Sequence, residues 1–214
     1  MDDLLPGFVA VEVAGAADFD GELLPAEAAH LSPRAVASRR REFTAGRVAA
    51  RRALGRLGVV GHPLTADNRA PVWPHGTTGS ITHTAGYCAA AVARTPDVRA
   101  VGIDAERRTI LPGNVRASIC LPEELDWCAA RPGEDWWPAV HFSAKEVVYK
   151  LWSPIVGTWL DFHDARLTID VEAATWTAHI DPRRLDRSPG APDRFTGRFH
   201  VAPDLVRSAG VVPA

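Results

Sequence analysis

The sequence predicts an α+β fold, because patterns typical of helices and of strands occur in both halves of the chain. Apolar residues repeat at helical spacing in two long segments, 33–57 and 137–152. Short β-rich runs, separated by turns that contain Gly or Pro, lie between and after these segments. Each half is therefore expected to combine helices with antiparallel strands. This suggests two similar lobes, 1–108 and 109–214, although no clear sequence repeat relates them.

One strand, one long helix and three further strands are expected in the first half. Residues 8–14 alternate apolar and polar side chains, as a half-buried strand does. Ser32 and Pro33 are expected to begin the long helix as its N-cap and first helical residue, and Gly58 is expected to end it. The Gly- and Pro-containing stretch 61–79 is expected to be a loop. The strands that follow should form an antiparallel meander over 80–84, 87–93 and 98–106.

A second amphipathic helix and three strands are expected in the second half. Pro122 and the acidic residues after it are typical of a helix start. In the segment 137–152, one face collects the apolar side chains of Val140, Ala144, Val147, Val148, Leu151 and Trp152. The tail alternates again, and its strands are expected at 165–172, 175–181 and 194–201.

Composition and charge exclude several classes of function. The formal net charge is −2, so no global field draws the protein to nucleic acid or to an anionic membrane. The cysteines number three and form no C-x-x-C pair, which argues against disulfides and for the reducing cytoplasm. The N-terminus lacks the features of a signal peptide, and the longest apolar run, 87–93, is too short to span a membrane. A cytoplasmic protein with no nucleic-acid or membrane partner is expected.

Two acidic residues in the segment 101–106 (VGIDAE) indicate a cation site. Residues two apart on a strand point to the same face, so Asp104 and Glu106 should project together while Ile103 and Ala105 face the core. Adjacent carboxylates repel each other unless a cation lies between them, and Mg²⁺ prefers such oxygen ligands. An exposed polar strand face would show the same pattern.

Three further features carry charge or can bind it. Glu146 and Lys150 are four residues apart, opposite the apolar stripe of their helix, a spacing that also fits a surface ion pair worth about 0.2–0.5 kcal/mol. Arg39 and Arg47 belong to a row of arginines whose planar guanidinium groups suit phosphate, although a solvated basic face would look alike. His83 has no second histidine at metal-ligand spacing, so a zinc site is not expected.

Five motifs occur in a fixed order along the chain. They are R-x-x-x-x-x-x-x-R from Arg39, P-x-W-P from Pro71, G-S-x-T-H from Gly79, G-I-D-A-E from Gly102 and F-x-A-K-E-x-x-Y-K from Phe142. In this combination the sequence resembles the phosphopantetheinyl transferases of the surfactin-synthetase-activating (Sfp-like) type, and most closely the actinobacterial enzymes. The resemblance extends over about residues 25–170.

The resemblance implies a fold and a reaction. The family fold is a pseudo-two-fold pair of α+β lobes with antiparallel sheets, and the active site lies in the cleft between the lobes. Its members transfer 4′-phosphopantetheine from coenzyme A to a serine of an apo acyl or peptidyl carrier protein and release 3′,5′-ADP. The expected partners are carrier domains of polyketide, nonribosomal peptide or fatty-acid synthases, and the chain is expected to be a monomer.

The resemblance also assigns residues. The family's ligands to Mg²⁺, for which Mn²⁺ can substitute, correspond to Asp104, Glu106 and Glu146. The positions that bind coenzyme A correspond to Arg39, Arg47, Arg69, Ser80, His83 and Lys145. Catalysis is assigned to Glu146 as the base for the serine, directly or through water, and to Lys145 or Lys150, which would neutralise the diphosphate. The chain departs from the family at Asn68-Arg69-Ala70, where Gly and Lys are common, and at Phe142, where many relatives have Trp.

Three other functions fit part of the same pattern. A coenzyme A-binding module would need the same binding residues without transfer, and an assay with an apo carrier would distinguish it. A metal-dependent phosphohydrolase would use the same carboxylates with water as the nucleophile. A nucleic-acid binder would use the arginine-rich helix 39–52, and the near-neutral net charge argues against it.

Overall fold

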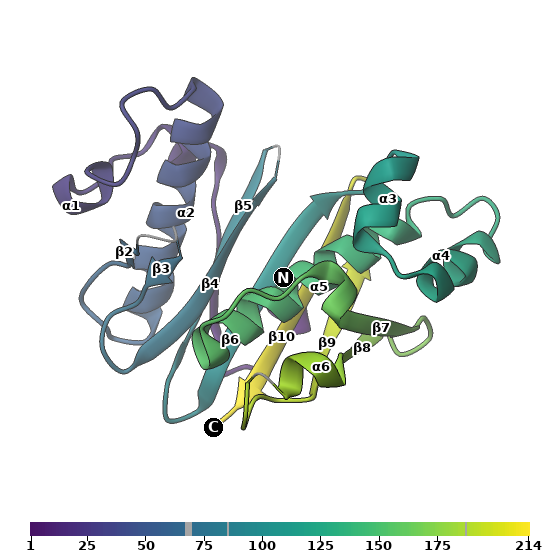
Figure 1. Ribbon diagram of the computed structural model, residues 1–214. Helices are drawn as coiled ribbons and strands as arrows, with labels where there is room; N and C mark the ends of the chain where they lie inside the picture. Colours follow the sequence, from purple (N-terminus) through teal and green to yellow (C-terminus); the bar gives the residue numbers. More distant parts are fainter. Residues whose placement is uncertain (67–69, 85, 187) are drawn as a thin grey trace.

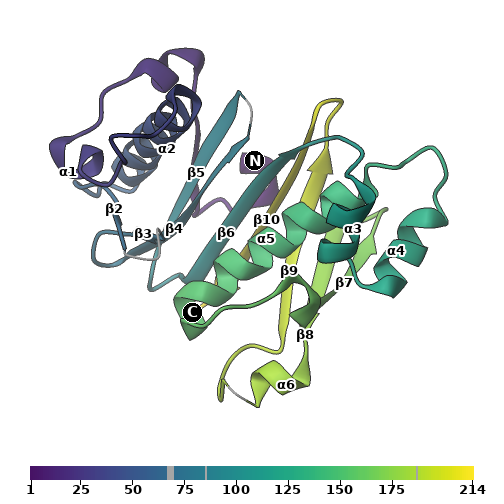
Figure 2. The same ribbon diagram turned by 45° about the horizontal axis from the view of Figure 1, so that its top comes forward.

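The computed structural model describes residues 1–66, 70–84, 86–186 and 188–214, and this part of the chain forms two lobes with antiparallel sheets (Figure 1). Each lobe carries one long helix on one face of its sheet, α2 (Ala37–Arg56) in the first and α5 (Trp137–Val156) in the second (Figure 2). The predicted α+β fold with antiparallel sheets in two lobes is therefore confirmed. None of the described helices combines the length and the apolar character that crossing a membrane requires.

The first lobe is built on a three-stranded sheet with the order β1-β5-β4. Its elements are η1 (Asp2–Leu4), β1 (Ala10–Val13), η2 (Ala16–Asp20), α1 (Pro25–Ala28), α2, β2 (Leu64–Thr65), β3 (Pro71–Val72), β4 (Thr77–Thr84) and β5 (Tyr87–Arg94). Alternate residues of β5 face opposite sides of the sheet. Ala90 and Val92 pack against α2, whereas Ala89, Ala91 and Ala93 face the second lobe. Small side chains on both sides let the helix approach the sheet closely.

The helix α2 begins at Ala37, four residues later than Pro33, where the sequence predicts it. The hydroxyl of Ser32 does not cap this helix but accepts from the backbone N–H of Arg34, at 3.2 Å, in a separate turn. Val36 then keeps an extended backbone before the helix starts. At the other end Gly58 takes a positive φ of 69°, as predicted for a residue that stops a helix.

The second lobe is built on a five-stranded sheet with the order β6-β10-β9-β8-β7. Its elements are β6 (Val98–Arg107), α3 (Gly113–Ile119), α4 (Pro122–Ala129), α5, η3 (Phe162–Asp164), β7 (Ala165–Asp170), β8 (Thr175–Ile180), α6 (Pro182–Leu185), β9 (Arg194–Val201) and β10 (Leu205–Pro213). The apolar stripe of α5 packs on this sheet, where Trp152 and Leu151 join Trp176 in a buried core. The predicted amphipathic helix over 137–152 is thus confirmed, and its apolar face is the one that packs on the sheet.

The predicted meander of three strands is wrong for its last member. β4 and β5 pair, but β6 pairs with β10, a strand that the sequence analysis did not predict. β6 therefore belongs to the sheet of the second lobe, although it lies before residue 108. The boundary between the lobes at residue 108 remains a prediction. β6, which ends at Arg107, is the strand that connects the two lobes.

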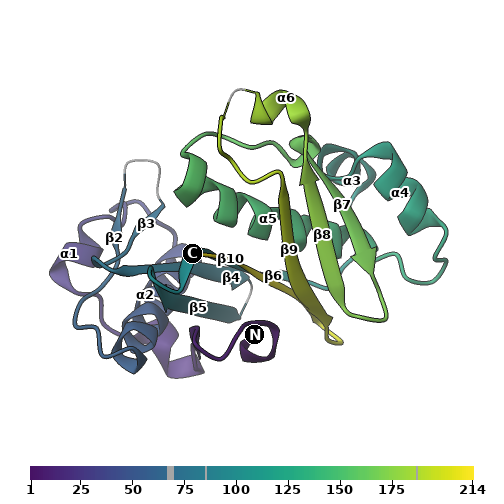
Figure 3. The same ribbon diagram turned by 90° about the horizontal axis from the view of Figure 1, so that it is seen from below.

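The two sheets meet where β4 runs beside β6 (Figure 3). Here the strands do not form a backbone ladder. Instead, the backbone N–H of Ile103 donates to Ser80 Oγ at 3.1 Å, and that of Ala105 donates to Thr82 Oγ1 at 3.0 Å. Ile103 and Ala105 themselves point into an apolar core that both sheets share. The lobes are consequently held in one register at this junction.

The packing of α5 on β6 depends on Gly102. A Cβ atom at this position would lie 2.9 Å from the backbone oxygen of Val147 and 3.1 Å from Leu151 Cγ. We expect Gly102→Ala to lower the free energy of unfolding by roughly 1–3 kcal/mol, as overpacking does, when unfolding by urea is measured. The control is Gly55→Ala in α2, where nothing lies within 4 Å of the new atom, and it should raise stability by about 0.5–1 kcal/mol. Equal effects of the two substitutions would contradict this packing.

Candidate active site

The contact between α5 and β6 brings acidic side chains of both elements together. Asp104 and Glu106 lie on the side of β6 that faces α5, as the period of the strand predicts. Asp104 is buried, and its Oδ1 accepts from Lys150 Nζ at 2.7 Å and from Thr82 Oγ1 at 3.3 Å. Lys150 Nζ also donates to the backbone oxygen of Ile103 at 3.0 Å. Strand, helix and first lobe thus all contact the same carboxylate.

Glu106 and Glu146 both have a raised pKa in this cluster. Burial, and then the charge of Asp104, raise the pKa of Glu106 to about 7, although Lys150 opposes the shift. Burial also raises the pKa of Glu146, to which the charge of Asp104 adds. The ionised forms of Glu106 and Glu146 are therefore less stable here than in water, and a further cation beside them would stabilise these forms.

The carboxylate oxygens of this cluster are ligands that fit Mg²⁺, but among the described residues they do not meet at one point. Asp104 Oδ2 is buried and has no hydrogen-bond partner among the described residues, so it can accept a ligand. Glu146 is near enough to Glu106 to contribute to the raised pKa of Glu106, and the oxygens of both are the hard ligands that Mg²⁺ prefers. Within the described part of the chain, no three acidic, histidine or cysteine side chains already form a group that could hold a metal ion.

A second, basic cluster lies in the first lobe, around a cavity of about 140 Å³. It is lined by Arg39, Glu42, Phe43, Gly46, Arg47, Pro71, Ile81 and His83. Arg39 Nη1 is 2.7 Å from His83 Nε2, and His83 Nδ1 is 3.3 Å from a carboxylate oxygen of Glu42. Two guanidinium groups and an imidazole around one cavity form a site suited to an anion.

Arg47 has fewer free donors than the sequence suggests. It is buried, and its guanidinium donates to the backbone oxygen of Pro63 at 3.0 Å and to Thr65 Oγ1 at 2.7 Å. It also stacks on Phe43, with 4.8 Å between the guanidinium carbon and the ring centroid. Arg47 therefore holds the segment 63–65 in place, and it also lines the cavity. Arg69, which the resemblance assigns to coenzyme A binding, lies outside the described residues.

Ser80 and Lys145 border cavities of this region, but their polar groups are engaged within the protein. Ser80 is buried, and its hydroxyl is engaged by the backbone of Ile103 at the junction of the lobes. The ammonium of Lys145 is buried and donates to Glu124 Oε2 at 2.6 Å and to the backbone oxygens of Ile119 and Phe162 at 2.9 and 3.0 Å. Its three N–H groups are thus used inside the second lobe, so the structure does not direct Lys145 at a diphosphate.

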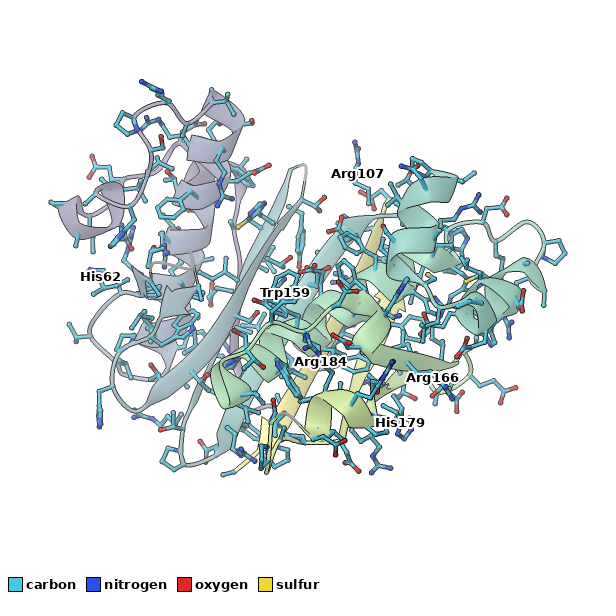
Figure 4. All side chains as sticks on the ribbon, in the orientation of Figure 1. His62, Arg107, Trp159, Arg166, His179 and Arg184 are labelled. Carbon is cyan, nitrogen blue, oxygen red and sulfur yellow. The ribbon has the colours of Figure 1, made fainter. Side chains whose placement is uncertain are left out.

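Two more cavities adjoin the acidic cluster, and Glu146 and Tyr149 line both. The larger, about 490 Å³, lies between the lobes and is lined by Ala66, Ala70, Pro71, Trp73, Thr78, Gly79, Ser80, Ile81, Glu146, Tyr149, Lys150, Ser153 and Pro154. The smaller, about 100 Å³, is lined by Lys145, Glu146, Tyr149, Trp159, Leu160, Asp161, Phe162 and Ala165. Trp159 is exposed and packs on Tyr149 with ring centroids 5.1 Å apart (Figure 4).

Sequence reasoning missed three residues of this region. Thr82, Tyr149 and Glu42 each contact the site or line its cavities. Thr82 and Tyr149 are letters of the G-S-x-T-H and F-x-A-K-E-x-x-Y-K motifs, so the motifs themselves carried the signal. Glu42 lies three residues after Arg39, on the same side of a helix, and only the position of His83 in space reveals its partner.

The sequence matches known families over most of its length. Residues 26–93 match the 4′-phosphopantetheinyl transferase N-terminal domain, and residues 100–195 match the 4′-phosphopantetheinyl transferase superfamily. The chain is 44% identical over 203 residues to the 4′-phosphopantetheinyl transferase Svp of Streptomyces mobaraensis, a match that covers 90% of this chain and 79% of the relative. It is 43% identical over 192 residues to PptT of Mycobacterium tuberculosis, covering 87% and 85% of the two chains. To Npt of Nocardia iowensis it is 39% identical over 177 residues, covering 82% and 72%.

The buried contacts of Lys145 predict a structural effect. We expect Lys145→Met to lower the free energy of unfolding by about 3–5 kcal/mol, because Glu124 would remain buried without its charge partner. The matched control is Arg166→Met, which removes an exposed partner of the neighbouring Glu123 (Figure 4). Its cost should stay below about 1 kcal/mol. Urea unfolding of both variants tests this, and a Lys145 variant as stable as the control would disprove a structural role.

Proposed function

The chain belongs to the 4′-phosphopantetheinyl transferase superfamily, and on this basis we propose how its residues transfer phosphopantetheine from coenzyme A to a serine of a carrier protein. The observation that supports this assignment best is the convergence of Asp104, Glu106, Glu146 and Lys150 from β6 and α5, between cavities that extend to either side. Coenzyme A has its diphosphate in the middle and a nucleotide and a pantetheine arm at its ends. The shape of the site corresponds to that order.

In the proposed arrangement the acidic cluster receives the diphosphate together with Mg²⁺. Asp104, Glu106 and Glu146 would hold the ion, and Asp104 offers Oδ2, which has no hydrogen-bond partner among the described residues. Mg²⁺, when bound, neutralises charge on the diphosphate and on the leaving group. Lys150 adds a second positive charge at the same place, because its ammonium already lies 2.7 Å from Asp104 Oδ1.

The nucleotide is proposed to occupy the first-lobe side. Arg39 and His83, with Arg47 behind them, would bind the 3′-phosphate in the basic cavity. The larger cavity adjoins it through Pro71 and Ile81, which line both, and it offers the flat ring of Trp73 to a base. The pantetheine arm would then leave the diphosphate in the opposite direction, into the smaller cavity between Tyr149 and Trp159.

Glu146 is proposed to act as the base for the serine. In the reaction the serine oxygen bonds to the phosphorus that carries pantetheine, the bond from this phosphorus to the bridging oxygen breaks, and 3′,5′-ADP leaves with that oxygen. The proton of the serine hydroxyl passes to Glu146, directly or through water. Burial raises the pKa of Glu146, which brings its basicity closer to what proton transfer at neutral pH requires. Lys145 has no part in this step.

Transfer and its metal dependence can be measured together. An apo carrier protein incubated with the chain, coenzyme A and Mg²⁺ should gain one phosphopantetheine group in the mass spectrum, EDTA should prevent this, and Mn²⁺ should restore it. Because Glu106 binds a metal only when ionised and its pKa is about 7, the apparent Mg²⁺ affinity should fall as the pH is lowered through 7.

The pH effect should be weaker in Glu106→Gln, which lacks the titrating group, and unchanged in Glu123→Gln, an exposed carboxylate of α4. A carrier modified equally well in EDTA would refute the metal role. Release of phosphopantetheine without any carrier would instead indicate a phosphohydrolase.

The basic cavity leads to a substrate-specific prediction. Arg39→Ala should raise KM for coenzyme A by roughly 10- to 150-fold, the value of one charge-assisted contact of about 1.5–3 kcal/mol, and should affect dephospho-coenzyme A little. Steady-state kinetics with both substrates measures this. Arg41→Ala serves as the control, because Arg41 lies on the same helix but pairs with Asp20 at the surface. Equal losses with both substrates would show that Arg39 does not bind the 3′-phosphate.

A further inference from the structure

Glu42 is an acidic side chain in a cavity that is otherwise suited to an anion. It lies on α2, one turn after Arg39, and its Oε2 is 3.3 Å from His83 Nδ1. Its side chain is partly buried, with 24% exposed, so it does not point freely into solvent. A carboxylate here would repel a phosphate, so its presence needs another reason.

The two contacts of His83 determine which of its ring nitrogens carries the proton. A guanidinium group can only donate, so Nε2 of His83, 2.7 Å from Arg39 Nη1, must be the acceptor. The single proton of the neutral ring therefore lies on Nδ1, facing Glu42. Burial lowers the pKa of His83, and the charges of Arg39 and Lys150 lower it further, while Glu42 and Asp104 raise it. The ring is thus neutral in the free protein at neutral pH.

A phosphate in the cavity would reverse the role of Nε2. Phosphate oxygens only accept, so His83 can bond to them through Nε2 only if that atom carries a hydrogen. Nδ1 keeps its hydrogen, 3.3 Å from the Glu42 carboxylate, and the ring then has two N–H groups and a positive charge. Arg39, no longer needed by Nε2, becomes free to turn to the same phosphate.

We propose that Glu42 is a positioning residue that holds His83 through Nδ1 and stabilises its cationic form, so that coenzyme A binds together with a proton taken from solvent. The inference rests on the proposed function in one respect, that the ligand brings a phosphate to this cavity. It adds a residue and a proton that the transfer reaction itself does not require.

The remaining charged groups near His83 do not replace Glu42. Asp104 of β6 is already paired with Lys150 of α5, and Arg39 and Arg47 are cations that oppose protonation of the ring. Burial raises the pKa of the Cys88 thiol on β5 to about 12, so it stays neutral. Glu42 is consequently the one group lining this cavity, among the described residues, that can stabilise the imidazolium by direct contact.

The direction in which pH changes the affinity follows from the protonation of His83 on binding. The pKa of His83 is higher in the complex than in the free protein, so affinity is greatest at low pH and declines as the pH rises through the pKa of the complex. The phosphates of coenzyme A, with a second pKa near 6, are ionised at about pH 7.5 and contribute little there. Proton uptake measured near that pH therefore reports on the protein.

Isothermal titration calorimetry measures the uptake. The full chain is titrated with coenzyme A in EDTA at about pH 7.5, in two buffers of different ionisation enthalpy, and wild type should take up more than about half a proton. His83→Gln should remove this uptake, because Gln cannot be protonated. Glu42→Gln, which keeps the shape without the charge, should reduce the uptake and raise Kd about 10-fold, the effect of one pKa unit.

The control is Asp20→Asn, which removes an exposed carboxylate that pairs with Arg41 of the same helix, and its uptake and Kd should equal those of wild type. Wild type that binds and transfers phosphopantetheine without proton uptake would overturn the inference and leave the proposed function intact. Uptake as large in His83→Gln as in wild type would belong to another group, such as Glu106, and would also overturn it. If Arg39→Ala bound coenzyme A as wild type does, the proposed nucleotide site itself would fail.

Discussion

Two hydroxyl groups on β4 supply the hydrogen bonds that join the sheets of the two lobes. β6 is an edge strand, so the outward backbone N–H groups of Ile103 and Ala105 need acceptors from outside their sheet. Ser80 and Thr82 provide these acceptors, and Thr82 also bonds to Asp104. Since the bonds fix β4 against β6 residue by residue, they fix the distance between the basic cavity, which lies beyond Thr82, and the carboxylates.

The two lobes bring different predominant charges to the site. The second lobe provides the three carboxylates of Asp104, Glu106 and Glu146. Burial, and then the charge of Asp104, raise the pKa of Glu106 and Glu146, while Lys150 opposes both shifts. The first lobe provides the guanidinium groups of Arg39 and Arg47. A ligand with phosphates at two places, together with a divalent cation, would neutralise both clusters at once. Binding of such a ligand together with the cation, as proposed, would therefore offset the cost of assembling like charges.

The sequence could predict those parts of the site that depend on one element alone. Asp104 and Glu106 share a face because a strand has period two, and Glu146 and Lys150 share a face because a helix repeats near four. The pairing of β6 with β10 could not be predicted, since it joins distant segments and β10 has Ser208, Ala209 and Gly210, weak strand formers, at its centre. The partner of Ser80 lies across the same junction of the lobes, so a motif match alone assigned this hydroxyl to coenzyme A.

The two lysines of the helix motif show where a motif match stops being informative. Positions 145 and 150 are five residues apart, and at about 100° per residue their side chains leave the helix roughly 140° from each other. Lys150 shares the side of Glu146 and reaches Asp104, while Lys145 turns to Glu124 and the backbone of Ile119 and Phe162. Both lysines cannot bind one diphosphate from this backbone. Lys145 instead anchors the segment at Phe162 that borders the smaller cavity, and it thereby shapes the space beside Glu146.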